Sequence, residues 1–346
     1  MEELKEKVRL TQYCHGAGCG CKISPAILDT ILKGKNIPGA FPSLLVGNEH
    51  KDDAAVYDLD GITSIVSTTD FFMPIVDDPF DFGAIASTNA ISDIYAMGGT
   101  PIMAIAILGW PLDKLPIEYA GVVLDGARKV CADAGIPLAG GHSIDAPEPI
   151  FGLAVTGKIP TAHVKRNSTA KPGDLIYLTK PLGIGMVTTA QKKGIATVED
   201  LELAKASMLR LNRIGALLAD KPEVHAITDV TGFGLAGHLL EVCEGSGCGA
   251  EIDLKSVPKF SFVQRYLEEK CHPGGTSRNW ASYGHNVILK DQEDRFILAD
   301  PQTSGGLLIA VDPAAQLQFE EELQDLGYAL QPIGRFVEGE TKLKVN

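Results

Sequence analysis

Apolar positions along this chain recur in two patterns: short continuous or alternating runs that predict strands, and longer helical repeats that predict helices. In the first half, the pattern predicts strands over residues 62 to 69, 102 to 108 and 150 to 159. It predicts helices over residues 81 to 97, with small residues on one face, and over 116 to 134. A strand-like AAVYDL run precedes the first of these strands with no helix between them.

A polar segment at residues 160 to 173, with two prolines, separates the two halves, and strands and helices then alternate again. Strands are predicted over 174 to 180, 224 to 228 and 306 to 311, and helices over 184 to 193, 199 to 219, 233 to 245 and 313 to 326. Consecutive strands without a helix favour an α+β fold of two mixed-sheet domains over a doubly wound parallel sheet. We expect an N-terminal segment over 1–50, a domain over 51–160 and a domain over 161–346.

The first 50 residues are rich in glycine, proline and polar residues. One helix is predicted there, over residues 25 to 33, with Ser24 as its cap and Pro25 in its first turn. The run Gly-Ala-Gly-Cys-Gly-Cys-Lys at residues 16 to 22 stands just before this helix. Glycines allow left-handed backbone and close approach to a ligand, so this run predicts a mobile loop outside the core.

Chemistry in this loop centres on Cys19 and Cys21, which lie directly before Lys22. An adjacent ammonium favours the thiolate, which is the nucleophilic form of cysteine. A zinc site that adds Cys14 and His15 is the alternative interpretation, but the spacing lacks the CxxC pairs of structural zinc sites. A reactive thiol is therefore favoured.

Composition narrows the class of protein. The chain has 346 residues, of which 45% are hydrophobic and 22% charged, as in ordinary globular proteins, and two domains are expected at this length. The net charge of −13 argues against a nucleic-acid surface. No apolar run reaches the roughly 18 residues that a membrane span needs, and the charged N-terminus lacks the apolar core of a signal peptide. A cytoplasmic location is expected.

Aspartates stand at unusual places in the predicted elements. Asp52 and Asp53 precede a strand-like run, Asp70 ends a strand, Asp93 lies within an apolar helix, and Asp229 ends another strand. Buried carboxylates are costly unless they are paired or bind a metal, and oxygen ligands of this kind suit Mg²⁺ that holds substrate phosphates. Helix caps, turns and salt bridges are the alternative for each single aspartate, but the set together favours a metal site.

Three glycine-rich runs follow predicted strands or aspartates, at residues 140 to 143 (GGHS), 233 to 238 (FGLAGH) and 301 to 306 (PQTSGG). The first follows a short apolar IPLA run, as a phosphate-binding turn would. The chain has neither GxxxxGK[ST] nor a GxGxxG that opens a helix after a strand. Walker-type and dinucleotide-binding folds are therefore disfavoured.

These residues resemble the selenophosphate synthetase (selenide, water dikinase) family. The resemblance starts at Leu10-Thr11-Gln12-Tyr13 and the cysteine run and covers nearly the whole chain. It continues through Gly47-Asn48-Glu49, residues 52–56, 68–72, 89–93, 140–143, 228–234 and 300–306. The cysteine run is specific to this family, whereas the aspartate and GGHS patterns are shared with the wider aminoimidazole ribonucleotide synthetase-like superfamily.

The resemblance implies a reaction in which ATP, selenide and water give selenophosphate, AMP and orthophosphate. It implies that Cys19 and Lys22 are catalytic and that Asp53, Asp93 and Asp229 hold Mg²⁺. Nucleotide contacts are implied for Lys22, His50, Lys51, Asp52, Asp70, Asp93, Gly141, His142 and Ser143. It further implies a homodimer paired through the N-terminal domains, with the nucleotide near the interface, a monovalent cation such as K⁺, and a selenium-delivery protein as a partner.

Two other functions are compatible with parts of the pattern. An ATP-dependent enzyme of the same superfamily that activates an amide or formyl oxygen would use the aspartates but not the thiol loop. A thiol carrier of metal or selenium would use Cys14, Cys19 and Cys21 but would leave the aspartates without a role.

Overall fold

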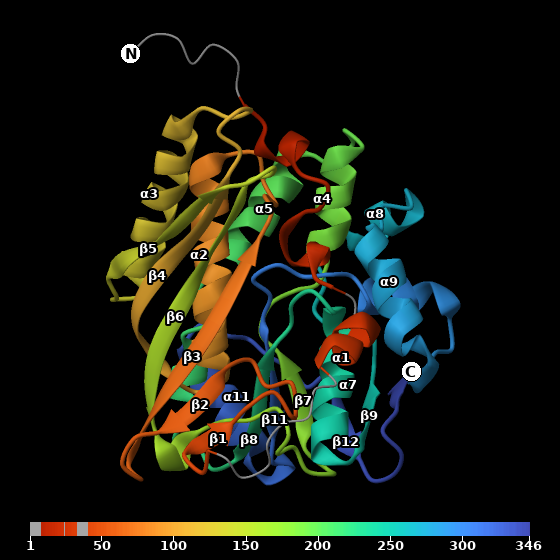
Figure 1. Cartoon of the computed structure of the whole chain (residues 1–346). Helices are drawn as coiled ribbons and strands as arrows, with labels where there is room; N and C mark the ends of the chain where they lie inside the picture. Colours follow the sequence, from red (N-terminus) through yellow and green to blue (C-terminus); the bar gives the residue numbers. More distant parts are fainter. Residues whose placement is uncertain (1–7, 24, 33–40) are drawn as a thin grey trace.

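The computed structural model describes residues 8–23, 25–32 and 41–346, and it contains two β-sheets with helices packed against them (Figure 1). Six of the described strands form the first sheet, in the order β1-β2-β3-β6-β4-β5. Its strands are β1 (Leu44–Val46), β2 (Ala55–Asp58), β3 (Thr63–Phe72), β4 (Thr100–Trp110), β5 (Leu138–Asp145) and β6 (Ile150–Pro160). All neighbours are antiparallel except β4 and β5, which are parallel, so the sheet is mixed.

Two helices, α2 (Pro79–Ala96) and α3 (Ile117–Asp133), pack together on one face of this sheet. Helix α2 begins where the sequence dictates, since Pro79 is in its first turn and the Asp78 carboxylate accepts a hydrogen bond from the Asp81 amide. A side chain at Gly83 would clash with the Val123 carbonyl on α3, so this glycine lets the two helices approach closely. Residues 82 to 96 of α2 are buried throughout.

Seven further described strands form the second sheet, in the order β10-β13-β9-β12-β7-β11-β8. They are β7 (Leu175–Leu178), β8 (Val224–Asp229), β9 (Gly249–Ile252), β10 (Val287–Ile288), β11 (Leu307–Val311), β12 (Gly334–Val337) and β13 (Leu343–Val345). Around it lie α4 (Ile184–Lys192), α5 (Val198–Leu209), α6 (Ile214–Leu217), α7 (Gly234–Ser246), α8 (Val263–Glu268), α9 (Gly274–Tyr283), α10 (Arg295–Leu298) and α11 (Gln316–Asp325). The prediction of two mixed-sheet domains is confirmed.

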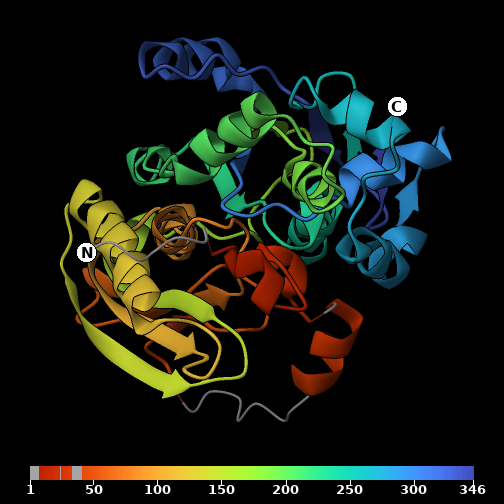
Figure 2. The same ribbon diagram turned by 90° about the horizontal axis from the view of Figure 1, so that it is seen from above.

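Helix α2 also contacts α5, α6 and β8, so it lies between the first sheet and the second half of the chain. Figure 2 shows α2 on the face of the first sheet that is turned toward the second half of the chain, with the red N-terminal segment beside the boundary between the two halves. This segment contains two short 3-10 helices, Leu10–Tyr13 and Gly18–Cys21, and α1 (Pro25–Leu32). Ser24, the predicted cap of α1, and residue 33, its predicted end, lie outside the described residues.

Some predicted elements are wrong in detail. The single helix predicted over 199 to 219 is two helices, because the backbone at Arg210 is extended. There the Arg210 guanidinium donates to the Thr179 carbonyl. The Asn212 side-chain amide donates to Ser92 Oγ and to the Gly305 carbonyl. These are tertiary hydrogen bonds, which the apolar pattern of a helix does not reveal. The helix predicted from 313 starts as a 3-10 turn and becomes α11 at Gln316.

The predicted phosphate-binding turn at residues 140 to 143 is also wrong, because these residues continue strand β5. Gly140 and Gly141 have positive φ angles of 139° and 158°, and β5 pairs with β4 at a shift in register. Within the described parts of the chain, no helix is both long and apolar enough to cross a membrane. The division into 1–50, 51–160 and 161–346 stays a prediction.

Candidate active site

Three carboxylates from distant parts of the sequence converge where the two halves of the chain meet. Asp53 precedes β2, Asp93 lies on α2, and Asp229 is the last residue of β8. One oxygen of each lies within 4.8 Å of those of the other two. Among the described residues, this is the one group of acidic, histidine and cysteine side chains that could share a metal ion.

Hydroxyl groups orient each of these carboxylates. Thr68 Oγ1 on β3 donates to Asp93 Oδ2 at 2.5 Å, and Ser92 Oγ donates to Asp229 Oδ2 at 2.6 Å. Thr228 Oγ1 donates to Asp53 Oδ1 at 3.0 Å. The last two bonds join the two halves of the chain, so the cluster depends on how the halves pack.

The cluster fits a hard divalent cation. Burial raises the pKa of the Asp53, Asp93 and Asp229 carboxyls, and the charge of Asp229 raises the pKa of Asp53 and Asp93 further. Asp53 Oδ2 is buried without a hydrogen-bond partner in the described structure. Three crowded carboxylates with an unpaired oxygen are the donor set that Mg²⁺ prefers. When bound, such an ion supplies positive charge for substrate phosphates.

We expect Mg²⁺ to raise the melting temperature by about 5 °C, and by more at pH 8 than at pH 6. The clustered carboxyls have raised pKa values in the folded state. Above about pH 4, the folded state without metal therefore binds more protons than the unfolded state does. Its free energy of unfolding consequently falls as the pH rises. Mg²⁺ binds the deprotonated cluster, so its effect grows with pH. Thermal unfolding of the wild type and of Asp53→Asn checks this, and an equal Mg²⁺ effect on both would contradict it.

Asn89 connects the cysteine segment to this cluster. It lies on α2 one turn before Asp93, so both side chains are on one face of the helix. Its amide nitrogen donates to Asp70 Oδ2, and its Oδ1 accepts from the Ser304 amide at 2.7 Å and from Cys19 Sγ at 3.2 Å. One amide therefore links the thiol to a carboxylate of the site.

Lys22 supplies a positive charge beside the carboxylates. Its Nζ lies 3.6 Å from Asp70 Oδ2. Burial lowers the pKa of Lys22, but the charge of Asp70 and of other acidic groups outweighs burial, so the pKa is raised. Lys22 therefore carries its charge beside the carboxylates, in a position to contact a phosphate.

The expectation of a loop outside the core is wrong for Cys19. Its side chain is 0% exposed and belongs to the apolar core, and its amide donates to Thr303 Oγ1 at 3.1 Å. Burial, followed by the charge of Asp70, raises the pKa of the thiol well above its ordinary value, although Lys22 acts in the opposite direction. In this arrangement burial outweighs the flanking cation and favours the thiol form of Cys19, contrary to the expected effect of Lys22.

The zinc interpretation of the cysteine segment has no support in the described residues. His15 Nδ1 lies 2.8 Å from Glu148 Oε2, and Cys14 Sγ donates to backbone carbonyls. Cys14, His15, Cys19 and Cys21 form no shared ligand group in this part of the structure.

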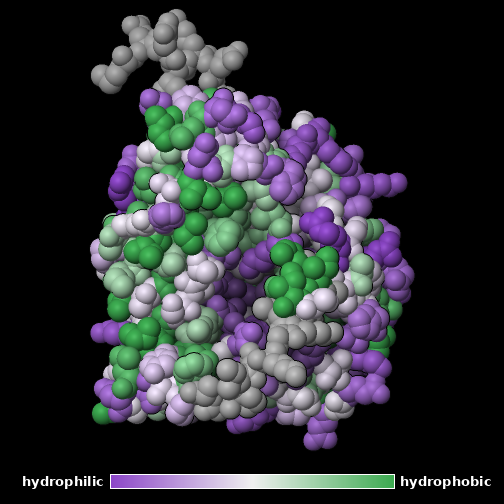
Figure 3. Space-filling model, in the orientation of Figure 1, coloured by the Kyte–Doolittle hydropathy of each residue, from purple (hydrophilic) through white to green (hydrophobic). Residues whose placement is uncertain are grey.

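An acidic cleft of about 300 Å³ opens over the carboxylates. Figure 3 shows a hydrophilic hollow on this face of the molecule. The lining includes two cations among many acids: Lys22, Lys51, Asp52, Asp53, Asp70, Asp93, Asp229 and Glu241. The cleft therefore brings together most of the residues that the resemblance implies.

Asn167 holds the Lys51–Asp52 loop against the cleft, a role that was not predicted for it. Its backbone N–H donates to Asp52 Oδ1 at 2.8 Å, and its side-chain Nδ2 donates to the carbonyls of His50 and Lys51. Burial raises the pKa of Asp52. His50 contributes its carbonyl to this loop and does not line the cleft, while its side chain is exposed. No sequence motif marked Asn167 within its polar segment.

His238 was also missed as a site residue. It lines the cleft from α7, stacks on Phe233 at 5.5 Å and lies 3.1 Å from Glu241 Oε2 through Nδ1. Its Nε2 lies 3.3 Å from Thr231 Oγ1. The FGLAGH run directly after Asp229 was the signal that could have identified it.

The structure does not bring Gly141, His142 and Ser143 to this cleft. They lie on β5, the outer strand of the first sheet, and line a separate groove with Leu124 and Arg128 of α3. Within one chain they therefore lie outside the acidic cleft, and their nucleotide contact stays a prediction.

Two family models match this chain, one in each half. Residues 51–159 match the family model of the AIR synthase related protein N-terminal domain, and residues 171–346 match that of the C-terminal domain. The selenide, water dikinase of Colwellia psychrerythraea is 61% identical over 330 residues, which cover 95% of this chain and 96% of the relative. That of Escherichia coli K12 is 58% identical and covers 96% of each chain.

This chain belongs to the selenide, water dikinase family. Solved structures share the fold of this family member at lower identity. A thiamine-monophosphate kinase from Stenotrophomonas maltophilia has a TM-score of 0.65 at 21% identity, over 93% of this chain and 94% of its own. The hydrogenase maturation protein HypE in complex with ATP has a TM-score of 0.61 at 19% identity, over 86% and 82% of the chains.

Proposed function

We propose that this protein makes selenophosphate from ATP, selenide and water and releases AMP and orthophosphate. The observation that carries the proposal is the link from the buried Cys19 thiol through Asn89 to Asp70, beside the cluster of Asp53, Asp93 and Asp229. Its relatives named selenide, water dikinase support the same reaction. An enzyme that activates an amide oxygen would have no use for a thiol placed in this way.

In this proposal, Asp53, Asp93 and Asp229 would hold Mg²⁺, which would supply positive charge for the triphosphate, while Asp70 would lie near the nucleotide and Lys22 would contact the transferred phosphoryl group. Selenide attacks the γ-phosphorus, the phosphorus–selenium bond forms and the bond to the β-phosphate oxygen breaks. Water then cleaves the bound ADP to AMP and orthophosphate. Positive charge in the cleft stabilises the charge that is spread over the transferred group in the transition state.

Movement of the cysteine segment completes the proposal. Cys19 is buried, so selenide reaches its thiol when the segment opens. Gly18 has a φ of 49° and packs against Ile75 and Thr303, where a side chain would clash. We propose that the segment opens for selenide and closes over the phosphates, which would exclude bulk water from the first transfer.

The experiment that tests the function incubates the protein with Mg-ATP, with and without selenide, and separates the nucleotides by chromatography. We expect AMP and orthophosphate to form together, and only when selenide is present. Conversion of ATP to ADP alone at the same rate without selenide would contradict the proposal. The same assay with K⁺ replaced by Na⁺ tests the predicted monovalent cation.

We further propose that the protein is a cytoplasmic homodimer paired through the first sheet. Strand β5 is an exposed edge, and large apolar side chains stand exposed on this sheet: Phe71 is 50%, Ile105 46% and Ile144 59% exposed. Exposed apolar patches and open edges of this kind favour association. Since His142 lies on β5, pairing here is how Gly141, His142 and Ser143 would reach a nucleotide.

Ile105→Asp is expected to convert the dimer to a monomer and to lower ATP consumption at least about tenfold, because a charge in an apolar interface is costly. The control Leu317→Asp changes an apolar residue that is 77% exposed on α11, away from this sheet. Light scattering gives the mass of each variant against the 36.8 kDa chain. A wild-type monomer, or an Ile105→Asp dimer, would refute the pairing.

A further inference from the structure

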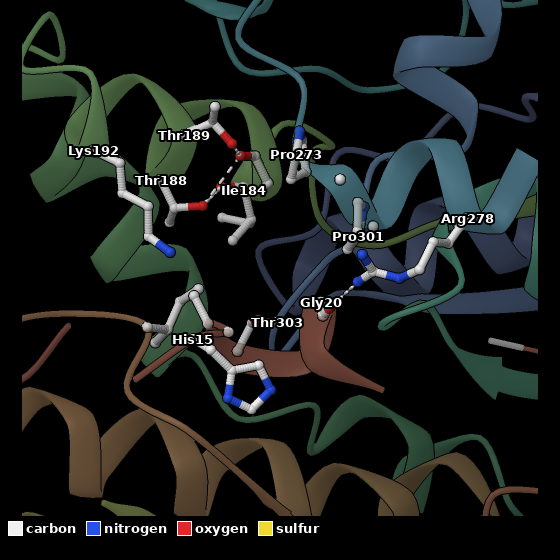
Figure 4. A pocket seen from close by; sticks show the side chains of 16 residues that line it. His15, Gly20, Ile184, Thr188, Thr189, Lys192, Pro273, Arg278, Pro301 and Thr303 are labelled. Atoms are coloured by element: carbon white, nitrogen blue, oxygen red, sulfur yellow. Dashed lines mark hydrogen bonds between the residues drawn. The ribbon is translucent and has the colours of Figure 1, made fainter. Parts of the chain in front are cut away.

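A second cavity lies on the other side of the cysteine segment from the acidic cleft. Its volume is about 240 Å³, and it is enclosed by the cysteine segment, α4, the N-terminal end of α9 and the Pro301–Thr303 loop (Figure 4). The two cavities have no lining residue in common. Lys22 faces the acidic cleft and Gly20 faces the second cavity, so the segment separates the two.

The second cavity is cationic. Its ionisable lining residues are His15, Lys192 and Arg278, with no carboxylate among the described residues that line it. Figure 4 shows Lys192 on α4 and Arg278 on α9 at opposite sides of the space, with His15 below. In a chain with a net charge of −13, a patch of this sign concentrates small anions.

The cations differ in how they are held. Arg278 Nη2 donates to the Gly20 carbonyl at 2.9 Å, while the described structure gives Lys192 Nζ no hydrogen bond or ion pair. Helix α9 has no side-chain cap, and its first residues, Gly274 and Gly275, line the cavity. Its N-terminal partial positive charge therefore adds to that of the side chains.

This cavity adjoins the backbone of Cys19, whose Sγ contacts Asn89. Thr303 lines it, and the Thr303 hydroxyl accepts the hydrogen bond from the Cys19 amide. Gly20, which follows Cys19 in the chain, also lines the cavity, and its carbonyl accepts a hydrogen bond from Arg278. An anion that binds between Lys192 and Arg278 therefore lies next to the backbone of residues 19 and 20 and competes for the bond from Arg278 to the Gly20 carbonyl.

The two cavities on either side of the cysteine segment differ in the sign of their charge. Selenide at neutral pH is the hydroselenide anion, and the acidic cleft presents six carboxylates and, in the proposed reaction, a triphosphate. Like charges repel an anion that approaches from that side. The cationic cavity presents the opposite sign on the other side of the same segment.

We propose that this cavity is the entry and binding site for the selenium substrate as hydroselenide, with Lys192 and Arg278 as its anion-binding side chains. The inference rests on the proposed function. The cavity holds the anion beside Cys19 until the segment moves, and the acidic cleft keeps ATP and Mg²⁺ on the opposite side. The two substrates thus enter by separate routes.

The test measures the KM for selenide at saturating Mg-ATP in Lys192→Ala, Arg278→Ala and the double variant. We expect about a tenfold rise for each single variant, a larger rise for the double variant, and partial recovery in Lys192→Arg. Lys193→Ala is the matched control, because Lys193 bonds the Glu269 and Lys270 carbonyls outside the cavity. The KM for ATP measures whether the acidic cleft is intact, and thermal unfolding shows whether each variant folds.

An unchanged KM for selenide in the double variant, with wild-type melting, would overturn the site. Orthophosphate is a second small anion, so its inhibition is measured in the same variants. Weaker phosphate inhibition with an unchanged KM for selenide would make the cavity a phosphate site and refute the proposal. If the wild type itself forms no AMP with selenide, the proposed function fails, and this outcome differs from a failure of the variants alone.

Discussion

Replacing Cys19 with serine is expected to reduce selenide-dependent AMP formation more than about 10³-fold, while Cys21→Ser keeps much of the wild-type rate. Cys19 Sγ is buried and contacts Asn89, which bonds Asp70. Serine fits the same space and its hydroxyl can donate to Asn89, so the loss reports on the sulfur. AMP formation and thermal unfolding of both variants check this.

Cys21 is the internal control for that experiment. It lies two residues away in the same 3-10 turn and is partly buried, and burial raises its pKa. Burial also raises the pKa of Cys19, and at both thiols burial outweighs the lowering effect of Lys22 on the pKa. The difference between the two is position, since Cys19 contacts the site through Asn89. Equal losses in the two variants would refute the assignment of roles.

The second large effect is expected for Asp93→Asn, with a loss of at least about 10²-fold in AMP formation. Asparagine keeps the size of the side chain but removes a charge from the cluster with Asp53 and Asp229. Fewer charges would bind Mg²⁺ more weakly, and the triphosphate would lose its main contact with this acidic cleft. Nucleotide assays and calorimetry with a non-hydrolysable ATP analogue measure the two effects.

Asp200→Asn provides a matched control, because Asp200 is also a buried carboxylate but bonds Tyr266 and Arg265 of α8 and does not line the acidic cleft. Its loss is expected to lower stability and to leave the affinity for Mg-ATP analogue near that of the wild type. If Asp93→Asn bound the Mg-ATP analogue as tightly as the wild type did, the cluster would not be the metal site.

The sequence predicted much of the fold because its elements have strong local signals. Helix α2 was predicted over 81 to 97 from its apolar and small residues and spans Pro79–Ala96, since the Asp78 cap and Pro79 start it two residues earlier. Strand β5 was missed at residues 140 to 143, because glycines suggest a turn and the pairing with β4 that makes them a strand is non-local.

The candidate site was predicted in part for the same reason. Aspartates at strand ends and on α2 are visible in the sequence, and the structure brings Asp53, Asp93 and Asp229 together. The burial of Cys19 was not predictable, because it depends on Asn89 and Thr303, which lie 70 and 284 residues away along the chain. The role of Asn167 was not predictable for the same reason, since its hydrogen-bond partners lie more than 100 residues away along the chain.

The most direct test of the central claim is the ³¹P nuclear magnetic resonance spectrum of the product formed from Mg-ATP and ⁷⁷Se-enriched selenide. The claim is that the carboxylate cluster and the cysteine segment together transfer the γ-phosphoryl group to selenium. We predict a new phosphorus signal split by a directly bonded ⁷⁷Se nucleus, together with equal amounts of AMP and orthophosphate, and neither signal in Cys19→Ser. A spectrum that shows only ADP and orthophosphate, with no phosphorus bonded to selenium, would contradict the claim.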